Sequence, residues 1–148
     1  MCRMSRNISL AMMVLIAVGG CPFQGLVYEE DMVGGYAVWA TDVIEQAAVV
    51  LKVSDHGSVT VVPPMVCAYG WNDDFIIAKR RPTKYGETAA IDANGTSWYI
   101  VQVPIQKTHG PLNEDEFAKL RATLQVPSTL SFTRTLPPRG ASQGQPSN

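Results

Sequence analysis

The chain has 148 residues, of which 46% are hydrophobic and 17% are charged, and its formal net charge is -1. This length suits one globular domain rather than two, and the hydrophobic content excludes a wholly disordered chain. All 13 acidic residues follow Cys21, and the one dense basic stretch is "AKRRPTK" (78–84). Because nucleic-acid binding needs clustered Lys and Arg to neutralise phosphates, we expect no nucleic-acid partner.

The first part of the chain has the layout of an export signal. A short segment with two arginines precedes the apolar run "ISLAMMVLIAV" (8–18), and two glycines then lead into Cys21. The run is much shorter than the roughly 20 apolar residues that a membrane-spanning helix needs. This order of basic, apolar and small residues is typical of a secretory signal peptide. Residues 1–20 are therefore predicted to be a signal that is cleaved between Gly20 and Cys21.

The stretch Val18-Gly19-Gly20-Cys21 resembles the lipobox of bacterial lipoproteins. In that family the cysteine thiol receives a diacylglyceryl group, and the new amino terminus is acylated after cleavage. Two or three acyl chains anchor a protein stably, whereas a single chain binds only marginally. The resemblance implies lipid attachment at Cys21 and a place at the bacterial cell envelope, on the membrane and outside the cytoplasm. The alternative is an N-terminal apolar helix with an incidental cysteine.

The cysteine count agrees with this interpretation. Cys2 would leave with the signal and Cys21 would carry lipid, so Cys67 would be the one remaining thiol and could form no internal disulfide. Cys67 lies in the apolar run "MVCAYGW" and is predicted to be a small buried hydrophobe. A catalytic thiol would need a nearby histidine and a setting that stabilises the thiolate, and the sequence offers no sign of either.

Composition divides the rest of the chain into three parts. Residues 21–34 have no clear hydrophobic period and are predicted to be a lipid-anchored tether. Residues 35–135 form the predicted α+β domain. Residues 136–148 are rich in Pro, Gly, Ser and Gln with little to bury, which predicts a disordered tail.

The domain contains a series of β segments joined by short turns. "SDHG" (54–57) and "NDD" (72–74) are placed for hairpin turns. Pro63-Pro64 ends the predicted strand 58–62. Strands that follow one another through short turns favour an antiparallel meander. The predicted strands are 35–40, 47–53, 58–62, 65–71, 75–81 and 97–103, with a short last one at 129–133.

One helix is marked in "GPLNEDEFAKLRATL" (110–124). Asn113 can cap it, Glu116 three residues later completes a variant of the capping box, and Phe117 begins an apolar stripe that continues through Leu120 and Leu124. The predicted fold is α+β: a single twisted antiparallel β-meander of about six or seven strands, with one C-terminal helix packed on a face.

Few residues suggest chemistry. His56 and His109 are the two histidines, and neither has a serine or cysteine partner in a recognisable nucleophile setting. A zinc site needs three or four closely spaced ligands, so we predict no metal and no cofactor. Asp73 and Asp74 are weak candidates for a hard cation, and with Asp92 they could form an acid/base pair.

Four aromatic residues in the predicted strands allow two interpretations. They could line an apolar groove for a ligand, although aromatic residues in strands more commonly belong to the core. These residues are Trp39, Trp71, Trp98 and Tyr99.

The order "PPMVCAYGWNDDFIIAKRRP", "SWYIVQV", "GPLNEDEFAKLRATL" resembles a family of small bacterial lipoproteins catalogued as domain of unknown function 3997. The resemblance covers roughly residues 35–132, and its most specific parts are 72–79 and 110–117. It implies a secreted, membrane-anchored α+β domain. It implies no activity and no catalytic residues.

Two functions from different classes follow. The favoured one is a non-enzymatic lipoprotein that binds an envelope protein, a glycan or a small ligand through a sheet edge or its aromatic strands. The alternative is a small envelope hydrolase that uses the turn aspartates, with or without a metal.

Overall fold

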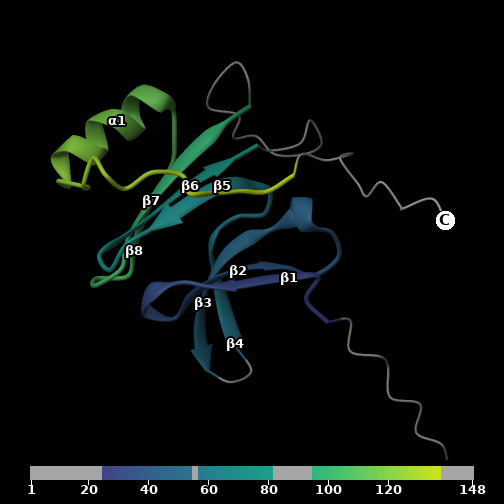
Figure 1. Cartoon of the computed structure of the whole chain (residues 1–148). Coiled ribbons are helices and arrows are strands. Elements are labelled where there is room, and N and C mark those ends of the chain that lie inside the picture. Colours follow the sequence, from purple (N-terminus) through teal and green to yellow (C-terminus); the bar gives the residue numbers. More distant parts are fainter. Residues whose placement is uncertain (1–24, 55–56, 82–94, 138–148) are drawn as a thin grey trace, which may run out of the picture.

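The computed structural model describes residues 25–54, 57–81 and 95–137. Two antiparallel sheets pack on each other, and one helix covers the far face of the second sheet (Figure 1). No helix in these ranges is long and apolar enough to cross a membrane.

The first sheet has the strand order β1-β2-β3-β4. Two short 3-10 helices, η1 (Val33–Gly35) and η2 (Ile44–Gln46), connect its first three strands. The strands are β1 (Tyr28–Asp31), β2 (Tyr36–Ala40), β3 (Ala48–Ser54) and β4 (Gly57–Val62).

The second sheet has the order β8-β7-β6-β5-β9. Its first turn is closed by Asn72, whose Oδ1 accepts hydrogen bonds from the backbone N–H groups of Asp74 (3.1 Å) and Phe75 (2.8 Å). Asn is favoured in turns for this reason. The strands are β5 (Val66–Trp71), β6 (Phe75–Arg80), β7 (Ser97–Gln102), β8 (Lys107–Leu112) and β9 (Arg134–Thr135).

Apolar side chains fill the space between the two sheets. Tyr36, Val38 and Val49 come from the first sheet, and Tyr69 and Ile76 come from the second, each with at most 1% of its surface exposed. Alternate residues of a strand point to opposite faces of the sheet. Ile77, which follows Ile76, therefore points to the opposite face of the second sheet and is buried in a separate layer.

That second buried layer lies under helix α1 (Glu114–Thr123). Ile77 and Ile100 point from the sheet toward Phe117 of the helix, and the rings of Trp98 and Phe117 are 6.5 Å apart between centroids. Because the second sheet is buried on both faces, β6 and β7 read as continuous apolar runs rather than as alternating ones.

The predicted helix cap is confirmed. The Asn113 Oδ1 accepts the Glu116 N–H at 2.9 Å, and the Glu116 carboxylate accepts the Asn113 N–H at 2.9 Å. This reciprocal pair is the capping box, and it places the first helical residue at Glu114 rather than in the preceding "GPL".

The prediction of a single meander is wrong, because the chain builds two sheets. Pro63 and Pro64 cannot donate to a sheet ladder, and Met65 has a φ of 83°. The backbone therefore leaves β4 and enters β5 in another sheet, where the Val66 N–H donates to the Ala47 carbonyl at 2.9 Å. The six predicted strands up to residue 103 are nevertheless present, within about one residue at each end.

The structure differs from the predictions in three further segments. The segment predicted as a tether (21–34) contains β1, so the folded part begins before Gly35. Strand β8 occupies residues predicted to be loop and helix start, and the predicted strand 129–133 is absent.

An extended segment replaces that strand and runs over β5 at Gly70, where an added Cβ would lie 2.0 Å from the Ser131 carbonyl oxygen. This close approach is possible because glycine has no side chain. The chain then forms β9, and Leu136 is buried with its N–H bonded to the Cys67 carbonyl at 2.9 Å.

Candidate functional site

The structure describes some of the candidate site residues predicted from the sequence, but not all of them. Cys21, His56 and Asp92 lie outside the described residues. Asp73 and Asp74 are exposed on the turn between β5 and β6. His109 lies on β8, where its Nε2 is 2.9 Å from the Gln102 Oε1.

Asp74 and Gln102 line a common surface cleft of about 170 Å³, together with Phe75, Pro104 and Ile105. Because Gln102 also contacts His109, two of the candidate residues lie at the same end of the second sheet. Burial and the neighbouring charge of Lys107 lower the pKa of His109, so the imidazole is neutral near pH 7. Within residues 25–54, 57–81 and 95–137 no three His, Cys, Asp or Glu side chains are grouped to hold a metal ion.

A second, more open depression of about 510 Å³ borders α1. Its charged side chain, Arg121, already donates to the carbonyl oxygens of Pro127 (3.0 Å) and Leu130 (2.7 Å). These bonds hold the segment after the helix, so the guanidinium has a structural role here.

Cys67 is confirmed as a buried residue with 8% of its surface exposed. Its Sγ lies 3.4 Å from the Lys79 carbonyl oxygen. Burial raises the pKa of the thiol, which therefore stays protonated and is a poor nucleophile.

The four aromatic residues do not form one groove. Trp98 and Tyr99 are buried on opposite faces of β7, one under the helix and one between the sheets. Trp39 lies under the Lys52 ammonium at 5.4 Å, and Trp71 lies under the Arg134 guanidinium at 5.6 Å. Cation–π contacts of this kind cover the two partly exposed rings.

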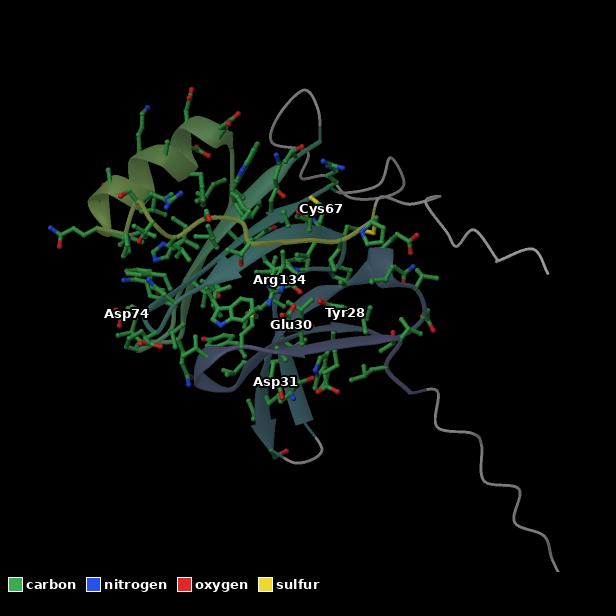
Figure 2. The ribbon with its side chains drawn as sticks, in the orientation of Figure 1. Tyr28, Glu30, Asp31, Cys67, Asp74 and Arg134 are labelled. Carbon is green, nitrogen blue, oxygen red and sulfur yellow. The ribbon has the colours of Figure 1, made fainter. Side chains whose placement is uncertain are left out.

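A polar cluster between the two sheets was not predicted from the sequence. Figure 2 shows Glu30 of β1 next to Arg134 of β9, with Tyr28 close by. The Arg134 Nε donates to the Glu30 Oε1 at 2.8 Å, and the Tyr28 hydroxyl donates to the Glu30 Oε2 at 2.8 Å. Tyr69 of β5 also donates to this oxygen, and the two tyrosine hydroxyl oxygens are 2.7 Å apart. We call these four side chains the Glu30 cluster.

The electrostatics of the Glu30 cluster favour an ionised carboxylate. Burial alone would raise the pKa of Glu30, but hydrogen bonds from Tyr69, Arg134 and Tyr28 outweigh it and lower the pKa below its usual value. Burial and the bonds to Glu30 and Tyr28 raise the pKa of Tyr69. A general acid needs a raised carboxyl pKa, and a general base needs free acceptor capacity. Glu30 has a lowered pKa, and three donors already occupy its two oxygens, so the observed role of the cluster is to join β1 to β5 and β9 of the second sheet.

The signal for the cluster was present in "YEED" (28–31). Tyr28 and Glu30 are two residues apart and so share one face of a strand, toward the second sheet, while Glu29 and Asp31 face outward. Lys52 bridges these two outward carboxylates, with its Nζ 2.8 Å from the Glu29 Oε1. The sequence does not indicate which of these two faces is the inward one, because the partners Tyr69 and Arg134 are distant along the chain.

The sheet edges differ in how they are protected. Strand β1 carries three acidic residues, β8 contains Lys107 and Pro111, and β9 has only two residues. Strand β4, with the sequence "GSVTVV" (57–62), has six residues and carries neither a charge nor a proline. Charges, prolines and short strands are the features that keep natural sheet edges from pairing with other chains. Among the described strands β4 is therefore the open edge.

Comparisons with known proteins give one match. The family model described as "Protein of unknown function (DUF3997)" matches residues 33–136. Neither the search of curated proteins nor the search of solved structures found a match. The matched range runs from η1 to the buried Leu136, so it includes Tyr69 and Arg134 of the Glu30 cluster but not Tyr28 and Glu30. Since the match covers more than half of the 148 residues, the chain belongs to the DUF3997 family of proteins of unknown function.

Proposed function

We propose that this protein is a lipid-anchored module that binds a partner at the bacterial cell envelope and does not act as an enzyme. The observation that carries the proposal is the stretch Val18-Gly19-Gly20-Cys21, whose first residue ends the apolar run 8–18. A diacylglyceryl group on the Cys21 thiol and an acyl chain on its amino group would attach the chain stably to a membrane.

The position of the first strand supports an anchored domain that stays close to the bilayer. The Val27 N–H donates to the Ala40 carbonyl at 2.8 Å, so the chain joins the first sheet at this residue. Val27 is six positions after Cys21, and an extended chain covers at most about 3.6 Å per residue. The sheet would then begin no more than about 22 Å from the lipid-bearing cysteine.

The chemistry of the described titratable groups favours binding over catalysis. The Glu30 carboxylate is ionised and engaged by donors from three side chains, and the Cys67 thiol is protonated. Both groups lack the reactivity that a general base or a nucleophile needs. The open edge of β4 offers unpaired backbone groups to an extended segment, which is a common mode of protein recognition.

The second candidate function, a small hydrolase, rests on the cleft beside Asp74. Its test is turnover of ester, phosphoester and glycoside substrates by the wild type and by Asp74→Asn, with and without divalent cations. Turnover that is lost in Asp74→Asn but kept in Asp73→Asn would replace the binding proposal.

The anchor is tested in full-length protein expressed in a bacterial host. Membrane fractionation and mass spectrometry of the N-terminal peptide should find the wild type on the membrane with lipid on Cys21. Cys21→Ser should abolish lipid attachment, whereas Cys67→Ser, the matched cysteine control, should retain it. Equal fractionation of Cys21→Ser and the wild type, with no lipid on the wild-type peptide, would contradict the anchor.

A further inference from the structure

The open edge of β4 is well exposed. Ser58, Val59 and Thr60 are all exposed, and Val59 retains 53% of its accessible surface although it points to the inner face of the sheet. Figure 1 shows the reason: the β3–β4 hairpin extends beyond the second sheet, which therefore does not cover its end. The edge at residues 58–60 is therefore accessible to a strand from another chain.

The middle of β4 is also its regular part. Residues 58–60 pair in unbroken register with residues 52–50 of β3. The register shifts of this hairpin lie on either side of that stretch. Irregular pairing bends and twists an edge, whereas regular pairing leaves it ready to accept a further strand. Val59 is the centre of the regular stretch.

We propose that β4 pairs antiparallel with β4 of a second copy of this chain, about a two-fold axis at Val59. In that register Val59 faces Val59 of the second copy, and Ser58 faces Thr60. Cross-strand pairs of β-branched residues and of hydroxyl residues stabilise antiparallel sheets. The two first sheets then become one continuous sheet. The inference names the partner of the proposed binding module and rests on that proposal, although the pairing itself does not require the lipid.

Charge makes β4 the described edge that is best suited to pair with a second copy. An antiparallel two-fold contact brings each strand against itself, so a charged strand meets its own charge. Self-pairing of β1 would oppose its acidic residues, and Lys107 and Pro111 hinder self-pairing of β8. Strand β4 is neutral and meets a neutral strand. A two-fold axis also keeps both Val27 residues at the same height along the axis, so both anchors could enter one membrane.

The test uses the full-length chain in cells, with a single new cysteine. Residues opposite each other in an antiparallel pair have Cα atoms about 4.5–5.5 Å apart, within the range that a disulfide bridges. Cells that express Val59→Cys are treated with diamide, a membrane-permeant thiol oxidant, and non-reducing gels then measure a product of twice the chain mass. Because the oxidant crosses membranes, the readout does not depend on export.

Val53 supplies the matched control, since it is 59% exposed on the neighbouring strand β3 of the same hairpin. In the proposed dimer two β4 strands separate the two copies of β3, which places them about 14 Å apart. We therefore expect Val59→Cys to give about tenfold more dimer than Val53→Cys. Equal crosslinking of the two variants, no crosslinking, or a product with a different protein's mass would overturn the second copy as the occupant.

A second measurement avoids cysteine chemistry. Two differently tagged copies are co-expressed, and the amount of one that co-purifies with the other is measured. Val59→Lys in both copies should lower the amount of co-purified protein to about one tenth of the wild-type amount or less, because two ammonium groups would oppose each other on the axis. Val53→Lys should leave it unchanged, and equal losses would overturn the proposal. The lipid on Cys21 is measured in the same samples, so failure of the anchor and failure of the dimer are distinguished.

Discussion

The two edges of the first sheet are built in opposite ways. Strand β1 has the sequence "YEED", with outward carboxylates bridged by Lys52 and an inward carboxylate bound to the second sheet. Strand β4 has the sequence "GSVTVV", and its middle residues are exposed. One edge is therefore closed by charge and by side-chain bonds to the rest of the fold, whereas the other is left available for pairing.

The largest expected effect concerns the inward carboxylate of β1. Glu30→Ala leaves the hydroxyls of Tyr28 and Tyr69 without their acceptor, and we expect it to lower the free energy of unfolding by about 3 kcal/mol. Urea unfolding followed by tryptophan fluorescence measures the change. Glu29→Ala on the outward face of the same strand is the matched control and should have a much smaller effect. If both variants lose the same stability, Glu30 does not join the sheets.

The same carboxylate predicts a pH dependence. Since the fold lowers the pKa of Glu30, its contribution to stability is present above the ordinary pKa of 4.5 and is lost as the pH falls through the folded value. Unfolding measured from pH 7 downward should therefore show a smaller fall in Glu30→Gln than in the wild type. A parallel fall in the two proteins would assign the acid sensitivity to other groups.

Removing the charges of β1 should make the two edges alike. In Glu29→Val/Asp31→Val the outward carboxylates are gone, and we expect the protein to associate at lower concentrations than the wild type. Static light scattering over a concentration series measures this change. The control is Asp42→Val/Glu45→Val, which alters the net charge equally outside any strand. Equal association of both double variants would mean that net charge matters rather than the edge.

The smallest expected effect is that of Lys52. This side chain bridges Glu29 and Asp31 on the exposed face, where ion pairs are screened by solvent. Lys52→Met removes the two ion pairs and the cation–π contact with Trp39, all on the solvent-facing side of the sheet, and should change the midpoint of urea unfolding only slightly. A clear loss of stability would show that the outward carboxylates repel each other strongly without the lysine.

The elements with local signals were predictable, and those held by distant partners were not. The capping box at Asn113 follows from residues three positions apart, and β6 follows from its apolar run. Strand β1 was missed because Glu and Asp are depleted in strands, and it forms here through pairing with β2 and through the donors around Glu30. Strand β8 was missed because "KTHGPL" contains Gly and Pro, which an edge strand tolerates.

The candidate site divides in the same way. The lipobox-like stretch that ends at Cys21 can be read from the sequence, as can the uncharged strand at 58–62. The apolar run around Cys67 also predicts that this residue is buried, as observed. It does not contain the information that this strand lies at an edge, because strand order depends on which sheet each strand joins. It also does not show that Glu30 and Arg134 meet, since a contact between residues so far apart forms only when the two sheets pack.

The local elements follow from short stretches of sequence, because turn residues, caps and hydrophobic periods act over a few neighbouring positions. The tertiary structure alone decided that two sheets form, that one inward carboxylate of "YEED" is shared by donors from three strands, and that β4 is left at an edge. These outcomes depend on burial and pairing between distant segments. The composition of a segment does not reveal its partners in the folded chain.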